Sequence, residues 1–168
     1  NLNGNYVKNN ENLMNIHGEY QQKIDYISNN IFKVNLCSSY NIDSIISEEE
    51  NDICKCSNII HSNSNNKKYI VTIDPLDGSS NLDNGMPTGT IFSIYKNNKE
   101  NTIDSLTKNN ILSSGYILYS SSINLVFTLL DKIYYFVYDQ DLKEFILIND
   151  NLKIKTFNKL YSINEGYT

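Results

Sequence analysis

Residues 69–81 have the sequence YIVTIDPLDGSSN. The first five are β-branched or apolar and predict a buried strand. Two carboxylates, Asp74 and Asp77, follow where this strand is expected to end, while Pro75 fixes its own φ and Gly78 permits a sharp turn. Hard oxygen ligands beside a turn rich in N–H and O–H donors suit Mg²⁺ on one side and a phosphate on the other. The segment therefore predicts a phosphoryl-transfer site, although each of its residue types is also common in ordinary surface turns.

Two more acidic segments precede this one. The apolar run at residues 42–46 is followed by three glutamates at residues 48–50, so carboxylates again stand at the end of an expected strand, where open α/β sheets place their ligands. Further upstream, residues 19–34 predict a helix that carries Asp25 near its start. Its apolar residues recur at helical spacing and form one stripe: Ile24, Ile27, Ile31 and Val34. Taken alone, Asp25 and the glutamate run are better explained as charges that face water.

Phosphate-ester hydrolysis explains why such groups would gather in one place. The reaction needs negative charge to be neutralised on the phosphoryl oxygens, and it needs a water that is partly deprotonated at neutral pH. Mg²⁺ ions bridged by carboxylates meet both needs, and a nearby acid/base pair takes the proton of the water. The cations also allow neighbouring carboxylates to stay ionised side by side.

Six blocks of the sequence, in family order, resemble the fructose-1,6-bisphosphatases of the Mg²⁺- and Li⁺-sensitive sugar/inositol phosphatase superfamily. The blocks are residues 47–49, 74–81, 89–95, 115–122, 144–147 and 161–167. Inositol monophosphatases share the D-P-x-D-G core but usually carry Thr-Thr where this chain has Ser79 and Ser80. Sedoheptulose-1,7-bisphosphatases share most of the blocks, and Asn81 modestly favours the fructose enzymes over them.

The resemblance implies a role for each matching residue. The metal ligands are expected to be Glu48, Glu49, Asp74, Asp77 and the main-chain carbonyl of Leu76, with Glu19 where the family usually has an aspartate. Asp25 and Glu49 match the pair that takes the proton of the attacking water. The substrate phosphates are expected to be held by Asp77, Gly78, Ser79, Ser80, Asn164 and Tyr167. The positions that contact AMP in inhibited members are Lys68, Tyr69 and Lys96, the last replacing an arginine.

The resemblance also implies how the chain relates to the whole enzyme. Residues 1–168 are expected to form one partial domain, the sheet-containing first half of the sugar-phosphatase fold, with residues 1–18 in the mobile loop of the family. The helices before that loop and the second half of the enzyme are missing from the sequence. The chain alone is therefore expected to be inactive or nearly so, because stabilising the transition state needs every charge in place.

The implied activity is the hydrolysis of the 1-phosphate of fructose 1,6-bisphosphate to fructose 6-phosphate in gluconeogenesis. It would depend on Mg²⁺, or on Mn²⁺ in its place, and would be carried out by a cytoplasmic homo-oligomer, usually a tetramer in the family. Two alternatives stay open. One keeps the chemistry but acts on sedoheptulose bisphosphate or an inositol phosphate, and the other is a catalytically silent module that binds a partner or joins subunits.

Composition and pattern predict an α/β fold with a large mixed or antiparallel sheet and flanking helices. Strands are expected at residues 90–95, 115–119, 125–130, 133–138 and 144–148, with Asp131 and Lys132 as a tight turn. The net charge of −5 argues against nucleic-acid binding. No apolar run is long enough to span a membrane.

Three cysteines are present, Cys37, Cys54 and Cys56. An odd and sparse set fits a reducing cytosol better than a disulfide scaffold. Cys-x-Cys pairs also bind soft metals, but here only His61 lies nearby and there is no second pair, so such a site is not favoured.

Overall fold

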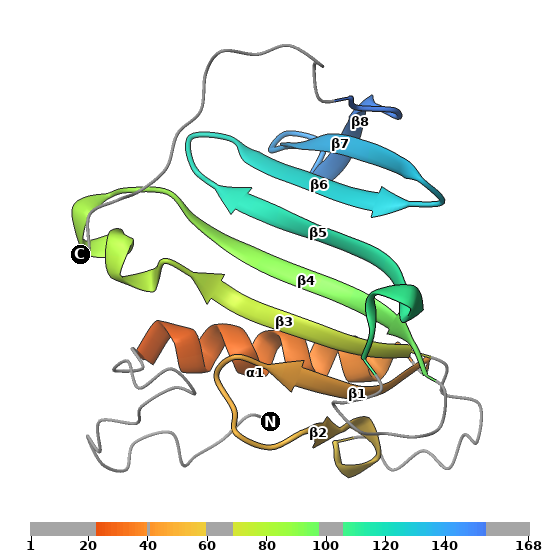
Figure 1. Ribbon diagram of the computed structural model, residues 1–168. Helices are drawn as coiled ribbons and strands as arrows, with labels where there is room; N and C mark the ends of the chain where they lie inside the picture. Colours follow the sequence, from red (N-terminus) through yellow and green to blue (C-terminus); the bar gives the residue numbers. More distant parts are fainter. Residues whose placement is uncertain (1–22, 40, 60–68, 98–105, 154–168) are drawn as a thin grey trace, which may run out of the picture.

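The computed structural model describes residues 23–39, 41–59, 69–97 and 106–153, and it shows the mixed α/β sheet that the sequence predicts. The helix is α1 (Lys23–Ser38), and the strands are β1 (Ile42–Ser47), β2 (Cys54–Lys55), β3 (Tyr69–Asp77), β4 (Thr88–Lys96), β5 (Ile111–Tyr119), β6 (Ile123–Leu129), β7 (Lys132–Asp139) and β8 (Glu144–Asn149). Short 3₁₀ turns are η1 (Cys56–Asn58), η2 (Ser79–Asn84) and η4 (Lys108–Asn110). The eight strands form one sheet in the order β2-β1-β3-β4-β5-β6-β7-β8 (Figure 1). No helix in these ranges could cross a membrane.

One strand pair sets the position of the site. β1 and β3 run parallel, whereas the other neighbouring strands of the sheet run antiparallel. The carboxyl ends of β1 and β3 therefore lie at the same edge, and Ser47 stands opposite Ile73. The amide of Glu48 extends this pairing by donating to the carbonyl of Ile73 at 3.0 Å. Glu48 and Asp74, which follow these two partners, are consequently level with each other.

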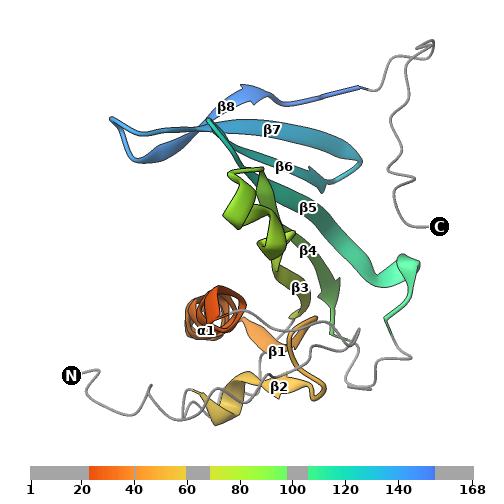
Figure 2. The same ribbon diagram turned by 90° about the vertical axis from the view of Figure 1, so that its left-hand side faces the viewer.

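The core lies between α1 and one face of β1, β3 and β4, as Figure 2 shows in a view along the helix. It is built from Cys37, Ile42, Ile45, Cys56, Val71 and Ile73, with Phe32, Leu36, Phe92 and Ile94 packed against it. The predicted helix is confirmed within the described residues, but its expected apolar stripe does not face this core. Ile31 and Val34 are 56% and 54% exposed. The buried side of α1 instead combines Asp25 and Asn29 with Phe32 and Leu36 further along.

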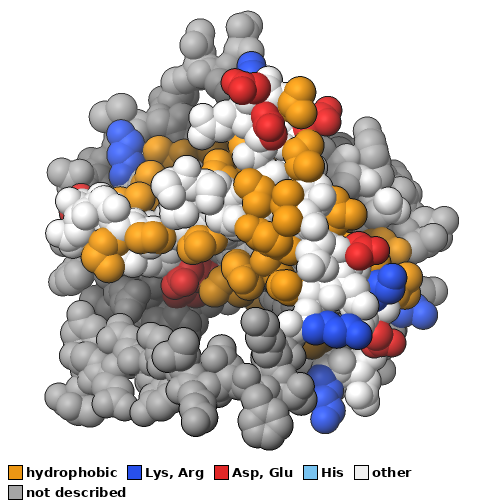
Figure 3. All heavy atoms as spheres, turned by 90° about the horizontal axis from the view of Figure 1, so that it is seen from above, with side chains coloured by type: hydrophobic (Ala, Val, Ile, Leu, Met, Phe, Trp, Pro, Cys, Tyr) orange, Lys and Arg blue, Asp and Glu red, His pale blue; other side chains and the backbone are white. Residues whose placement is uncertain are grey.

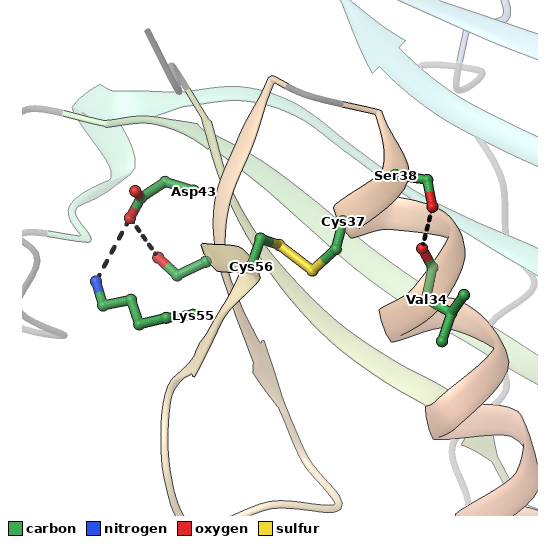
Figure 4. Close-up of a disulfide and its surroundings, with 7 residues drawn as sticks. Val34, Cys37, Ser38, Asp43, Lys55 and Cys56 are labelled. Carbon is green, nitrogen blue, oxygen red and sulfur yellow. Dashed lines mark hydrogen bonds and ion pairs between the residues drawn. A yellow bond between two sulfur atoms is a disulfide. The ribbon is translucent and has the colours of Figure 1, made fainter. Parts of the chain in front are cut away.

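Two of the three cysteines are disulfide-bonded in the structure, so the expectation of reduced cysteines, which rested on their odd number, was wrong. Cys37, near the end of α1, is disulfide-bonded to Cys56 of η1, with 5.0 Å between their Cα atoms (Figure 4). Both residues are buried, at 2% and 0% exposure. The count alone missed this pairing because an odd set leaves one thiol over, and Cys54 is that free thiol. The bond joins the helix to the β2–η1 segment on the β1 side of the sheet.

Strands β4 to β8 form an antiparallel meander, with short connections from β5 onward. The expected turn is displaced by one residue, because Leu129 pairs with Lys132 and the turn consists of Leu130 and Asp131. Both have positive φ, 50° and 62°, as type I′ hairpins require. Stacked rings of Phe127, Tyr134 and Phe136 lie on the α1 side of this meander. They pack against one another, as aromatic side chains on one face of a sheet commonly do.

The outer strand β8 exposes its apolar residues. Phe145, Ile146, Leu147 and Ile148 are between 38% and 57% exposed. Figure 3, which views the molecule from above Figure 1, shows apolar side chains gathered over this part of the surface. This part of the sheet contributes no residue to the buried core cluster.

A methyl group at Gly115 should disrupt the pairing of β5 with β6. A Cβ built there would lie 2.4 Å from the carbonyl oxygen of Val126 and 2.6 Å from the Cβ of Phe127. Because the first of these atoms belongs to the backbone, Gly115→Ala is expected to lower the free energy of unfolding by roughly 1–3 kcal/mol. Urea denaturation followed by circular dichroism measures the change. Gly85→Ala is the comparison: its Cβ would meet no atom within 4 Å, so only its φ of 64° opposes it. Equal losses would contradict the packing argument.

Candidate active site

The site lies where β1 and β3 end, beside the start of α1. β3 is longer than expected and continues through Asp77, with an irregularity in its pairing to β4 between Asp74 and Asp77. Pro75 sits at this irregularity, where a residue without an N–H is tolerated. Its carbonyl accepts a hydrogen bond from the Thr90 hydroxyl at 2.8 Å. The strand end is therefore held in place by β4 while its acidic side chains remain available.

The Asp74 side chain is fixed by its own turn. Its Oδ1 accepts a hydrogen bond from the amide of Leu76 at 3.1 Å. Gly78 then takes φ of 75°, which most residues with a side chain avoid, and opens η2. The amide of Asn81 donates to the carbonyl of Gly78 at 2.9 Å, which closes the turn. The predicted phosphate cradle, residues 78–80, thus starts at the strand end as expected.

Asp25 joins this turn from a distant part of the chain. Its Oδ2 accepts a hydrogen bond from the Ser79 hydroxyl at 3.2 Å, although the two residues are 54 positions apart. Asp25 is only 3% exposed. A buried carboxylate needs a partner to offset its lost hydration, so a merely solvated charge does not describe it. The structure brings the helix and the cradle together, as the sequence predicts.

The glutamate run is held at three points. Glu48 is tied to β3 through the carbonyl of Ile73, and the amide of Glu49 donates to the buried hydroxyl of Ser47 at 3.3 Å. Glu50 contacts α1 instead: its Oε1 accepts a hydrogen bond from Asn29 Nδ2 at 2.9 Å and forms an ion pair with Lys33. Sequence reasoning assigned no role to Asn29 or Lys33. Their spacing of four residues, with Asn29 four residues after Asp25, was the signal that was available.

The carboxylates interact electrostatically. Burial, followed by the nearby charges of Glu48, Asp77 and Asp25, raises the pKa of Asp74 to about 6, against the lowering effect of the hydrogen bond from the Leu76 amide. Such mutual repulsion is what a divalent cation would relieve, and oxygen donors of this kind suit Mg²⁺ or Mn²⁺. The donor chemistry therefore fits a metal. The described residues nevertheless contain no group of three or more His, Cys, Asp or Glu side chains that converges on one point.

The raised pKa of Asp74 makes a prediction for the metal-free chain. Because its folded-state pKa of about 6 exceeds the ordinary 3.8, the folded state binds more protons between these values. Stability should therefore fall as pH rises from about 4 to 7. In EDTA, the unfolding free energy of the wild type should decline over this window relative to that of Asp74→Asn, which cannot ionise. Parallel pH profiles for the two proteins would contradict the shift.

A cavity of about 370 Å³ adjoins the cradle on the side of β4 and β5. Its lining combines Asp77, Gly78 and Asn81 with apolar and aromatic side chains of β4 and β5, among them Ile91, Tyr116 and Leu118. This volume is in the range of small-ligand pockets. The cavity places open space directly beside the predicted phosphate cradle.

The remaining predicted residues fall into two groups. Tyr69 and Lys96 stand opposite each other across β3 and β4, at the end of the strands remote from Asp77. Outside the described residues lie the expected mobile loop at 1–18 and Glu19, Lys68, Asn164 and Tyr167. Ser80 lies in η2, within the predicted cradle, and Asp77 is the last residue of β3.

Comparison with known proteins agrees with this geometry. The family model for "Fructose-1-6-bisphosphatase, N-terminal domain" matches residues 7–150. The cytosolic fructose-1,6-bisphosphatase of Solanum tuberosum is 40% identical over 156 residues, which cover 90% of this chain and 44% of the relative. The enzyme of Schizosaccharomyces pombe is 38% identical over 160 residues, 93% of this chain and 44% of the relative. The chain thus spans less than half the length of these relatives.

Solved structures give the same result. The holo form of Leishmania major fructose-1,6-bisphosphatase superposes with a TM-score of 0.80 at 34% sequence identity. The match covers 91% of this chain and 48% of that one. The apo form of the same protein gives a TM-score of 0.74, also at 34% identity.

Proposed function

Since the chain belongs to the fructose-1,6-bisphosphatase family, we propose that it is part of an enzyme that hydrolyses the 1-phosphate of fructose 1,6-bisphosphate to give fructose 6-phosphate and inorganic phosphate. The observation that carries the proposal is the meeting of three separate segments at one edge of the sheet. Helix α1 brings Asp25, the end of β1 brings Glu48, and the end of β3 brings Asp74, close enough that Glu48 and Asp25 both raise the pKa of Asp74.

The residues divide the chemistry between them. The backbone amides of Gly78 and Ser79 and the hydroxyl of Ser80 would hold the phosphate to be removed, because the turn presents donors to its oxygens, while the Ser79 hydroxyl donates to Asp25. Glu49 and Asp25 would take the proton of the attacking water as its oxygen bonds to phosphorus. The bond between phosphorus and the sugar oxygen breaks, and the leaving oxygen takes a proton from solvent to become a hydroxyl, while the proton taken from the attacking water returns to solvent. The hydrogen bond from Ser79 would keep Asp25 oriented beside the cradle.

Mg²⁺, or Mn²⁺ in its place, would be held by Glu48, Glu49, Asp74, Asp77 and the Leu76 carbonyl, together with Glu19. When bound, it would neutralise charge on the phosphate and lower the pKa of a bound water. The further proposals are that Asn164 and Tyr167 hold the second phosphate and that Lys68, Tyr69 and Lys96 bind AMP.

We also infer a cytoplasmic, gluconeogenic enzyme that acts as a homo-oligomer, in line with the cytosolic potato relative. This chain alone is expected to be inactive, because it spans 44% of that relative and transition-state stabilisation needs the complete site.

The test is phosphate release from fructose 1,6-bisphosphate with Mg²⁺ and with EDTA. It compares this chain with the full-length product of the gene that encodes it. Activity that depends on Mg²⁺ and appears only in the longer protein supports the proposal. Sedoheptulose 1,7-bisphosphate and inositol 1-phosphate serve as competing substrates. A higher kcat/KM for either of them, or no activity with any of the three, would overturn the assignment.

A further inference from the structure

Helix α1 presents a polar side to the sheet. Asp25 and Asn29, one turn apart, are 3% and 2% exposed and point to the same side as the core residues Phe32 and Leu36. A buried amide must find partners in the protein. The Nδ2 of Asn29 finds one in Glu50, 21 positions away in the sequence, whereas its Oδ1 has no hydrogen-bond partner among the described residues. The contact with Glu50 is therefore the hydrogen bond that holds this buried side chain within the described residues.

Glu50 differs from the two glutamates before it. Glu48 and Glu49 are expected to serve the metal and the water, but the Oε1 of Glu50 is occupied by Asn29 and Lys33. Its own amide donates to the carbonyl of Ser47 at 3.3 Å, so the same residue also closes the turn that carries Glu48 and Glu49. One side chain thus joins this turn to the helix.

The helix has two such attachments facing the site. Asp25 is bonded to Ser79 at its start, and Asn29 and Lys33 are bonded to Glu50 in the next turns. The first attachment leads to the phosphate cradle and the second to the glutamate turn. Core packing and the Cys37–Cys56 bond hold the far end of α1. Loss of the second attachment would leave the end near the site to be held at Asp25 itself, the residue that must be placed.

We propose that Glu50 is a positioning residue: through Asn29 and Lys33 it fixes helix α1 against the turn of Glu48 and Glu49, and so sets the placement of Asp25 relative to Glu49. The inference rests on the proposed function, because it concerns the pair that takes the proton of the attacking water. Small displacements of such a pair lower kcat strongly. They should leave the phosphate cradle, and hence KM, nearly unchanged.

The test measures kcat and KM for fructose 1,6-bisphosphate at saturating Mg²⁺ in the full-length gene product, well below the melting temperature of each variant. Glu50→Ala is expected to lower kcat by at least about tenfold while KM changes less than about twofold. Glu50→Gln keeps an oxygen for Asn29 and should recover most of the lost kcat. Asp52→Ala also removes one negative charge, but from an exposed side chain two residues further along the chain. Its kcat and KM should match those of the wild type.

Asn29→Leu tests the contact from the other side and covers the case in which Glu50→Ala does not fold. It should lower kcat in the same direction as Glu50→Ala. If the wild type is active but kcat in Glu50→Ala and Asn29→Leu equals that of Asp52→Ala, or if only their melting temperatures fall, the positioning role is overturned and the proposed function stands. An inactive wild type would overturn both.

Discussion

Asp74→Ala and Glu48→Ala are each expected to abolish Mg²⁺-dependent phosphate release in the full-length gene product. The rate should fall at least about a hundredfold, because each change removes a charge that acts on the developing transition state. The fold should survive, and for Asp74 the reason is specific. Its pKa is raised to about 6 by burial and by Glu48, so the ionised side chain is unfavourable at neutral pH without a cation. Phosphate release and thermal unfolding, measured on the same preparations, test both halves of the prediction.

Glu144→Ala is the matched control for these variants. It removes one exposed carboxylate from β8, at the opposite side of the sheet from β1. Its activity should equal that of the wild type. Unchanged turnover in Asp74→Ala or Glu48→Ala would show that the strand ends do not form the site. A large drop in melting temperature would instead show that these acids mainly hold the fold together.

Loss of the Cys37–Cys56 bond is expected to produce the largest change in stability. The bond closes a loop with a sequence separation of 19, and cross-links of this span stabilise by roughly 3 kcal/mol, mainly by restricting the unfolded chain. Cys37→Ser should therefore lower the free energy of unfolding by about this amount. Urea denaturation of the oxidised chain, with and without a reducing agent, measures it.

The controls for this prediction use the third cysteine. Cys54 is a free thiol, so Cys54→Ser should retain both the bond and its sensitivity to reductant. In unfolded, unreduced chain, alkylation should label one thiol of the three cysteines in the sequence. Labelling of all three, or no effect of reductant on the wild type, would contradict the pairing.

The sequence was most informative where one local segment carries both the turn chemistry and the acids. Residues 69–81 correctly predicted a strand followed by a tight turn, because Pro75 and Gly78 restrict the backbone regardless of what surrounds them. Glu48 and Asp74 were also expected to gather, since both follow expected strands, where open α/β sheets place their ligands; the parallel pairing of β1 with β3 is what brings them level. The strand was expected to end before Asp74, but its pairing to β4 extends it to Asp77.

The orientation of α1 could not be predicted in the same way. Its apolar residues form a clear stripe, and burial of that stripe is the usual expectation. The structure buries the side with Asp25 and Asn29 instead, because Ser79 and Glu50 supply partners that come from distant positions. The disulfide escaped prediction for a related reason. Cys37 and Cys56 are brought together by the packing of α1 on β1, which spacing in the sequence does not reveal.

The parallel pairing of β1 with β3 requires a longer connection than the antiparallel hairpins of the sheet do. From β4 to β8, each strand pairs with the next one along the chain, and β5 to β8 are joined by short turns. β1 and β3 are instead separated by residues 48–68, a segment that includes the edge strand β2. The entropic cost of bringing two segments together grows with the length of chain between them. The glutamate turn and the Asp74 strand end therefore meet through closure of this longer segment, which costs more chain entropy than the short turns between β5 and β8.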